Sequence, residues 1–381
     1  MTHQTWRPRR VCLALAAPLL LAGGLTGAGP AASAASCQNW TGVPPPSPGT
    51  ASNVLDGVAM VSACDAWAVG FSGGSGQTLT EHWNGSSWAV VPSPSPGSAF
   101  NTLTSVRAVS AADIWAVGSS SSGAGDQTLI LHWNGSSWTQ VPSPDPGSSF
   151  SDLRGVRVVS AQDAWAVGDY SSGAGNQTLI LHWNGTTWTQ VPSPDPAHDN
   201  ILTGVAATSA QDAWAVGYTG LVDQTLILHW NGSSWTQVPS PSPGSSNQLA
   251  AVGATSTANA WAVGFADDGT TDRTLVLHWN GTAWTQVPSP NQGGAAATNS
   301  LKAVAATSAG NAWAVGTFID GTIHSTLILH WNGTTWTAVP SPHPGTTSDL
   351  FAVAATSTSN AWAVGSYTDD GPAQALALHC C

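Results

Sequence analysis

Residues 202–241 read LTGVAATSAQDAWAVGYTGLVDQTLILHWNGSSWTQVPSP and contain four short apolar or β-branched segments separated by turn residues. Such residues favour extended backbone, and the Asn-Gly pair at 231–232 is typical of a tight hairpin turn. Gly, Pro, Ser and Thr recur every few residues, which disfavours helix. We therefore predict four consecutive strands, at residues 202–209, 213–217, 225–230 and 235–238.

The hexapeptide DAWAVG of this stretch, or a near copy, occurs seven times at a mean spacing of about 49 residues. Its tryptophans are Trp67, Trp115, Trp165, Trp214, Trp261, Trp313 and Trp362. Units of four short strands and about 50 residues are typical of β-propeller blades. Residues 37–381 hold a whole number of such units, as closure of a ring requires. The repeat therefore predicts an all-β, seven-bladed β-propeller with four-stranded antiparallel blades.

The two ends of the chain complement each other. The seventh unit stops at LALHCC, without the outer strand that follows LILHWNG in the other units. The missing piece matches CQNWTGVP at residues 37–44, so we expect the N-terminal strand to complete the last blade and close the ring. The expected domain is 35–381, with blades at approximately 55–98, 103–148, 153–198, 202–246, 249–294, 301–345, and 350–381 plus 37–49.

Residues 1–34 have the pattern of a secretion signal peptide: a basic start, an apolar run at 11–25 and a small-residue cleavage triplet at 32–34. Arg9 and Arg10 leave the twin-arginine export route open. Five basic and twenty acidic residues follow, a net charge near −15, which disfavours nucleic acid and anionic membranes as partners. No later apolar run is long enough to span a membrane. We expect a secreted, extracellular protein, monomeric and bacterial in composition.

Four cysteines follow the signal segment: Cys37, Cys64, Cys380 and Cys381. An even number in an oxidising compartment favours disulfides. A bond from Cys37 to Cys380 or Cys381 would close the ring covalently, and Cys64 would take the remaining partner; the sequence leaves the pairing open. Lipid attachment at Cys37 is an alternative, although the preceding residues lack the large aliphatic side chain of a lipobox.

Along the whole mature chain, the pattern WAVG…LILHWNGTTWTQVP resembles kelch-type and Asp-box (BNR-like) propeller repeats. AVG stands where kelch repeats end the second strand with two glycines, and HWNGTTW is similar to a degenerate Asp-box turn. The resemblance implies a strand order with LTGVAATS innermost and WTQVPSP outermost. These families include enzymes, adhesins and scaffolds, so the resemblance implies no single function.

Residues that recur in every unit are interpreted as scaffold. The repeated Trp side chains are expected to pack between blades. An Asp or Asn precedes each AWAV, and we expect it to cap the tight turn through backbone N–H groups. One His recurs in each third strand, in a different blade each time, so these residues cannot converge on one metal ion. They are His82, His132, His182, His229, His278, His330 and His379.

Function is expected where the units differ. Differences gather in the loops between second and third strands and in the crossovers between blades, which share one rim, called here the variable face. In so acidic a chain, basic residues there or in the channel predict a pocket for a carboxylate or another anion, because Arg binds oxyanions bidentately. Neutralisation by Asp152 and Asp272 is the alternative. The candidate ligand-binding residues are Arg107, Arg154, Arg157, Arg273 and Lys302.

Two further groups lie on this face. Carboxylates suit Ca²⁺ as a cofactor, and solvated loop carboxylates are the alternative. The candidate metal residues are Asp267, Asp268, Asp272, Asp369 and Asp370. Aromatic residues that would stack on a glycan are Phe100, Phe150, Tyr170, Tyr218, Phe265, Phe318 and Tyr367.

The sequence favours an extracellular, non-catalytic binding or adhesion propeller, whose ligand on the variable face is a glycan or an extracellular protein. No catalytic residue is assigned. A polysaccharide-acting lyase or glycosidase that uses the basic channel-mouth residues is the first alternative. A structural cell-surface repeat protein is the second.

Overall fold

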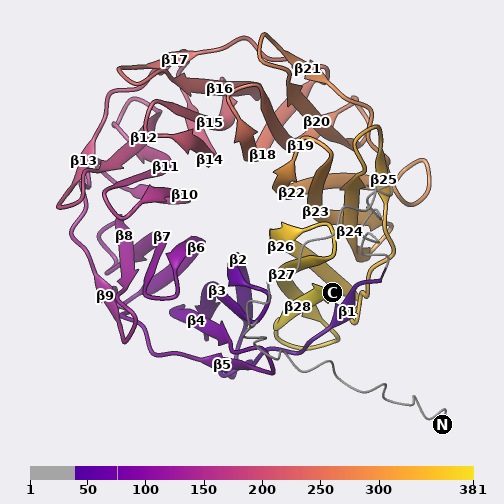
Figure 1. Cartoon of the computed structure of the whole chain (residues 1–381), viewed down its shortest axis with the longest axis horizontal. Coiled ribbons are helices and arrows are strands. Elements are labelled where there is room, and N and C mark those ends of the chain that lie inside the picture. The colour runs from indigo at the N-terminus through magenta and orange to yellow at the C-terminus, as the bar shows by residue number, and fades with distance from the viewer. Residues whose placement is uncertain (1–38, 75) are drawn as a thin grey trace, which may run out of the picture.

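The computed structural model describes residues 39–74 and 76–381. These residues form antiparallel sheets arranged as a ring around an open centre (Figure 1) and contain no helix. Among them, accordingly, no helical segment could cross a membrane. Five sheets have four strands each, and a sixth has eight. The all-β arrangement is that of a β-propeller.

The first strand of each repeat lies innermost in the ring (Figure 1), and its residues line a central channel. Its apolar and β-branched residues are covered by neighbouring sheets on both sides, which explains why the strands lack a simple polar–apolar alternation. The inner strands are β2 (Asn53–Ser62), β6 (Phe100–Ser110), β10 (Ser151–Ser160), β14 (Asn200–Ser209), β18 (Ser246–Ser256), β22 (Thr298–Ser308) and β26 (Thr347–Ser357).

The remaining strands follow outward in chain order. The second strands are β3 (Asp65–Ser72), β7 (Asp113–Ser121), β11 (Asp163–Ser171), β15 (Asp212–Thr219), β19 (Asn259–Asp267), β23 (Asn311–Asp320) and β27 (Asn360–Thr368). The third strands are β4 (Gln77–Trp83), β8 (Asp126–Trp133), β12 (Asn176–Trp183), β16 (Gln224–Trp230), β20 (Asp272–Trp279), β24 (Ile323–Trp331) and β28 (Gln374–Cys380). The outer strands are β5 (Trp88–Val90), β9 (Trp138–Gln140), β13 (Trp188–Gln190), β17 (Trp235–Gln237), β21 (Trp284–Gln286), β25 (Trp336–Ala338) and β1 (Thr41–Gly42).

The N-terminal strand lies outermost beside the C-terminal one. β1 pairs antiparallel with β28, with Thr41 opposite His379. The eight-stranded sheet consists of two antiparallel sets, β22–β25 and β26–β28 with β1. One parallel pair, His324 with Thr347, joins the two sets. The first and last segments of the described chain therefore lie side by side, as expected from the complementary ends.

The core consists of apolar layers between neighbouring sheets. Trp67 of β3 is 2% exposed and packs on the next sheet, with its ring centre 4.7 Å from that of Trp133 and 5.4 Å from that of Trp138. Trp40 packs edge-on against Trp313 at 5.4 Å in the same manner. The expected role of the repeated tryptophans between sheets is confirmed, and Trp40 takes the outer-strand position for the last set.

The repeated histidines form a scaffold pair with the residue before AWAV. In each repeat the His Nε2 lies 2.7–3.1 Å from an Asp or Asn Oδ1 on the neighbouring second strand. The same His ring packs on the adjacent Trp ring at 4.1–4.6 Å. Packing and hydrogen bonding thus account for all seven.

The tight turns differ from expectation. The Asp or Asn oxygen faces the His, and the turn amide is instead bound by the Ser that ends the inner strand, as in Cys64 N to Ser62 Oγ at 3.2 Å. The physical reason is that Ser, opposite the Asp or Asn across a two-residue turn, lies closer to the free N–H.

Candidate functional site

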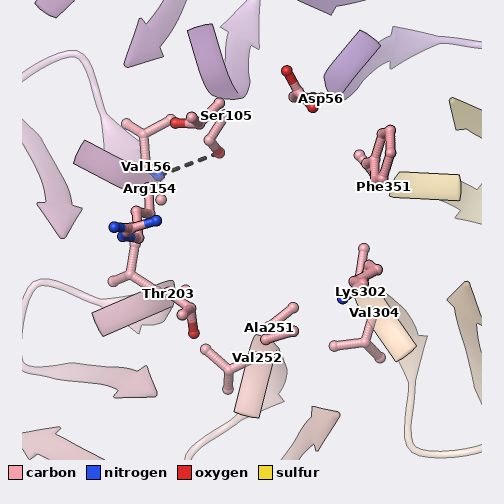
Figure 2. Close-up of a pocket in the computed structure, with 18 of the residues that line it drawn as sticks. Asp56, Ser105, Arg154, Val156, Thr203, Ala251, Val252, Lys302, Val304 and Phe351 are labelled. Carbon is pink, nitrogen blue, oxygen red and sulfur yellow. Dashed lines mark hydrogen bonds between the residues drawn. The ribbon is translucent and has the colours of Figure 1, made fainter. Parts of the chain in front are cut away.

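A bulge in each inner strand aims one side chain into the channel. The pairing with the second strand shifts register directly after the leading Leu, for example between Leu153 and Gly155. A bulge places an extra residue outside the ladder and redirects its side chain. Seven bulged residues, called here the bulge ring, line one section of the channel: Asp56, Thr104, Arg154, Thr203, Ala250, Lys302 and Phe351. Figure 2 shows Asp56, Arg154, Lys302 and Phe351 facing the channel from different strands.

Arg154 is positioned by a buried carboxylate. Its Nε lies 2.8 Å from Asp169 Oδ1, and its Nη2 lies 3.7 Å from Asp152 Oδ2. The Asp169 side chain is 1% exposed, whereas that of Arg154 is 40% exposed. Burial raises the pKa of Asp169 more than Arg154 lowers it. Arg154 is thus fixed through one edge of its guanidinium and offers the rest to the channel. The sequence interpretation named Asp152 and missed Asp169.

Lys302 lies across the mouth of the channel from Arg154 (Figure 2). Within the described ranges 39–74 and 76–381, it forms no ion pair. Burial lowers its pKa, and Asp349 and Asp272 oppose that effect from a distance. Its ammonium group is therefore available to a ligand.

The mouth is a cavity of about 380 Å³ that combines these cations with aromatic side chains. Of the seven variable-face aromatics that were predicted to stack on a glycan, only Tyr218 and Phe265 line it, and Phe351 joins them. Phe351 and Asp56 were missed by sequence reasoning, although each directly follows the leading Leu, as Arg154 and Lys302 do.

Asp56 is the acidic member of the bulge ring. Burial raises its pKa to about 7, well above its ordinary value of 3.8. Among the described residues, no hydrogen bond or ion pair to its carboxyl group is present. A carboxyl with a pKa near neutrality is able to accept or donate a proton.

Arg107 and Arg157 lie deeper, at the end of the channel nearer the tight turns. Both line a cavity of about 190 Å³ that the aromatic residues of the mouth do not reach. The predicted basic set is thus divided between two levels: Arg154 and Lys302 at the mouth, and this pair below.

Arg273 is not among the channel-lining residues. Its Nε lies 2.9 Å from Asp268 Oδ2, and its Nη2 donates to Ala295 O at 2.9 Å. It therefore joins two neighbouring loops. The partner is Asp268 and not the expected Asp272.

The candidate metal residues remain dispersed. Asp267 faces Asp272 across β19 and β20, while Asp369 and Asp370 lie beyond β27 in another sheet. Asp268 is held by Thr270 and Arg273, whose hydrogen bonds keep its pKa below the ordinary range. In the described part of the chain, no group of three or more His, Cys, Asp or Glu side chains is arranged to hold a metal ion.

The cysteines can be placed only in part. Cys381 is exposed with a free thiol, whereas Cys64 and Cys380 are both engaged in interactions. Cys37 lies outside the described residues, as does the predicted signal segment 1–34. The disulfide pairing therefore stays a prediction.

Comparison with known proteins shows the fold. No family model and no curated protein matches the chain. Among solved structures, it is similar to YCF48 bound to D1 peptide, with 15% identity, TM-score 0.54 and coverage of 90% of this chain and 96% of that one. It is also similar to a PL25 ulvan lyase bound to -[GlcA(1-4)Rha3S]-, with 8% identity, TM-score 0.51 and coverage of 90% and 94%. The GH74 xyloglucanase from Xanthomonas campestris matches with 13% identity, TM-score 0.53 and coverage of 88% and 55%. These likenesses support a β-propeller of four-stranded blades.

Proposed function

We propose that this protein is an extracellular, non-catalytic binding propeller whose ligand occupies the channel mouth on the variable face. One observation carries the proposal: the bulge ring places Arg154 and Lys302 across a cavity that Tyr218, Phe265 and Phe351 also line. Cations bind carboxylate or sulfate groups, and aromatic faces pack on sugar rings or apolar side chains. An acidic glycan or an acidic protein segment fits this combination.

The similar structures support both ligand classes. One is described as bound to a peptide and another to an oligosaccharide, so this fold accommodates either. The loop after β15 also exposes Leu221 and Val222 beside the mouth residue Tyr218, at 86% and 62%. These apolar side chains add contact area for a partner on the same rim.

The blade number, the repeat family and secretion are also part of this proposal. Counting the two antiparallel sets of the eight-stranded sheet separately gives seven blades, the number inferred from the repeat. We retain the kelch-like or Asp-box-like assignment of the repeats on the motif resemblance alone. Secretion rests on the signal pattern of residues 1–34.

The test is a glycan-array and polysaccharide pull-down screen of residues 35–381, followed by titration calorimetry with any acidic hit. Lys302→Ala removes an unpaired cation, and we expect about tenfold weaker binding or more. Arg154→Ala alone would leave Asp169 buried and uncompensated, so Arg154→Ala is combined with Asp169→Asn, with Asp169→Asn as its control. Arg273→Ala removes the same charge as Lys302→Ala but lies outside the mouth, so this variant should bind the ligand with wild-type affinity.

No binding to any carbohydrate would exclude the glycan and leave an acidic protein segment as the proposed ligand. Unchanged affinity in both mouth variants would contradict the proposal, because the ligand would then bind outside the mouth.

One observation favours a polysaccharide-acting enzyme as the second candidate. Asp56, with a pKa of about 7, shares the bulge ring with Arg154 and Lys302. Cations that stabilise a sugar carboxylate beside a group able to take a proton are components of lyase chemistry. Turnover of an acidic polysaccharide that Asp56→Asn abolishes, with binding retained, would support this candidate over the binding module.

A further inference from the structure

The lower channel holds two guanidinium groups on adjacent inner strands. Arg107 of β6 and Arg157 of β10 occupy equivalent positions and line the same cavity of about 190 Å³. The other side chains there are aliphatic: alanines, valines and Met60, with Gly253 completing the wall. Two like charges thus share one cavity whose other side chains are apolar.

Neither guanidinium has an acidic partner in residues 39–74 and 76–381. Arg107 Nη1 donates to Val106 O at 2.9 Å and to Val58 O at 3.5 Å. Arg157 Nε donates to Ala207 O at 3.2 Å. Because each guanidinium carries five N–H donors, most of the donors in this cavity have no protein acceptor.

The two charges are also uncompensated at longer range. Burial and, to a smaller extent, the nearby positive charge of Arg157 together lower the pKa of Arg107 to about 10. The acidic residue that lines the adjoining section, Asp56, has a pKa of about 7 and is partly protonated at neutral pH. Both arginines are partly buried, and a partner of opposite sign would stabilise their charges; none of the described residues supplies one here.

We propose that a small tetrahedral oxyanion, sulfate or phosphate, binds between Arg107 and Arg157. Two Arg forks present paired N–H donors, which match pairs of oxygens on a tetrahedral dianion. A single water needs only about 10–15 Å³ of such space, so the cavity holds the ion with several waters. The section between this cavity and the mouth, of about 90 Å³, is lined by residues of both levels. The site is separate from the mouth and does not depend on its ligand.

Thermal unfolding of residues 35–381 in sulfate, phosphate and chloride at matched ionic strength tests this site. Wild type should show a saturable rise in Tm of a few degrees with sulfate or phosphate and none beyond the ionic-strength effect with chloride. The concentrations of sulfate and of phosphate that give half of the saturable Tm rise identify the preferred ion. Arg157→Met should abolish the saturable rise, and Arg157→Lys should weaken the apparent affinity about tenfold, because a lysine keeps the charge but loses the fork.

The design distinguishes an ion site from a structural role. Without oxyanion, Arg157→Met should be as stable as wild type or more stable, because it removes charge repulsion; with saturating oxyanion the order should reverse. Lys302→Ala should keep the full sulfate response, which separates this site from the mouth. Soaking crystals in selenate should place anomalous density between the two arginines. Equal Tm responses to sulfate and chloride, or an unchanged response in Arg157→Met, would overturn the proposal.

Discussion

Glu81 is a buried carboxyl group at a position where the other repeats carry leucine. It is fully buried, and both of its side-chain oxygens lack a hydrogen-bond partner within the described residues. Side chains alternate along a strand, so Glu81 shares a face with Leu79 and Trp83, and that face packs on the last sheet. Ala377 on that sheet is smaller than its counterparts, which are Ile or Val in five repeats and Thr80 in the first. Burial raises the pKa of Glu81 to about 8.

Substitution of Glu81 by Leu should stabilise the protein most at alkaline pH. The folded-state pKa lies above the ordinary 4.5, so the stability associated with the protonated form is complete below pH 4.5 and is lost as pH rises through about 8. We expect Glu81→Leu to raise the unfolding free energy at pH 9 by an amount on the order of 4 kcal/mol. Denaturant titrations from pH 6.5 to 9 measure this difference, with Glu81→Gln as the isosteric control. If the unfolding free energies of wild type and Glu81→Leu changed with pH in parallel, this prediction would be wrong.

At the scale of the element, the second and third strands are joined by one His–Asp or His–Asn pair in each repeat. Burial lowers the pKa of His278, His330 and His379, which are the three that face Asn. An amide oxygen accepts a hydrogen bond without adding negative charge. A carboxylate in the same place would favour the imidazolium.

Exchange of Asn311 for Asp should therefore raise the pKa of His330, whose Nε2 lies 2.7 Å from Asn311 Oδ1. An adjacent opposite charge shifts a pKa by about 1–3 units. The folded-state pKa rises, so the variant gains stability at acidic pH and loses that gain as pH increases through the new pKa. NMR titration of the imidazole protons reports the shift, and His278 in the same sample provides the unchanged reference. An unaltered His330 pKa would contradict the electrostatic account of this pair.

The strands themselves were predictable from the sequence. The predicted segments 202–209 and 225–230 correspond to β14 (Asn200–Ser209) and β16 (Gln224–Trp230). Local cues sufficed, because turn residues bracket every strand and the repeat supplies the same boundaries several times. Pairing of the two chain ends followed from the missing outer strand.

The candidate site was predictable only in part. The repeat put Arg154 and Lys302 at one position of the inner strand and Arg107 and Arg157 at another. It could not show that the two positions lie at different levels of the channel, because a bulge breaks the alternation that decides which side chains face the channel. The ion-pair partner of Arg154 could not be predicted from the sequence either. Asp169 lies on another strand and reaches Arg154 only through the pairing of β10 with β11.

At the scale of the whole molecule, the ring depends on contacts between its two ends. β1 is only two residues long, and its ladder continues through Val43 N to Ala377 O at 2.9 Å. Asn53 N at the start of β2 donates to Ala373 O at 2.8 Å, which connects the first and last sheets directly. Because few backbone bonds hold β1, side-chain packing contributes to the closure as well. Trp40, 4% exposed, is the residue placed to do this.

Trp40→Ala should open the ring at its closure. Truncation of a buried Trp costs about 3–5 kcal/mol, and here it removes the packing of Trp40 on Trp313 beside β1. We expect a lower Tm together with rapid proteolytic cleavage in residues 39–50. Trp188→Ala is the matched control, because Trp188 packs on Trp115 in the same geometry but lies on β13, which is covalently continuous with its own sheet. That control should lose stability without selective cleavage at the N-terminal segment. If both variants are cleaved at the same sites and rates, then β1 closes the ring no more critically than any other outer strand.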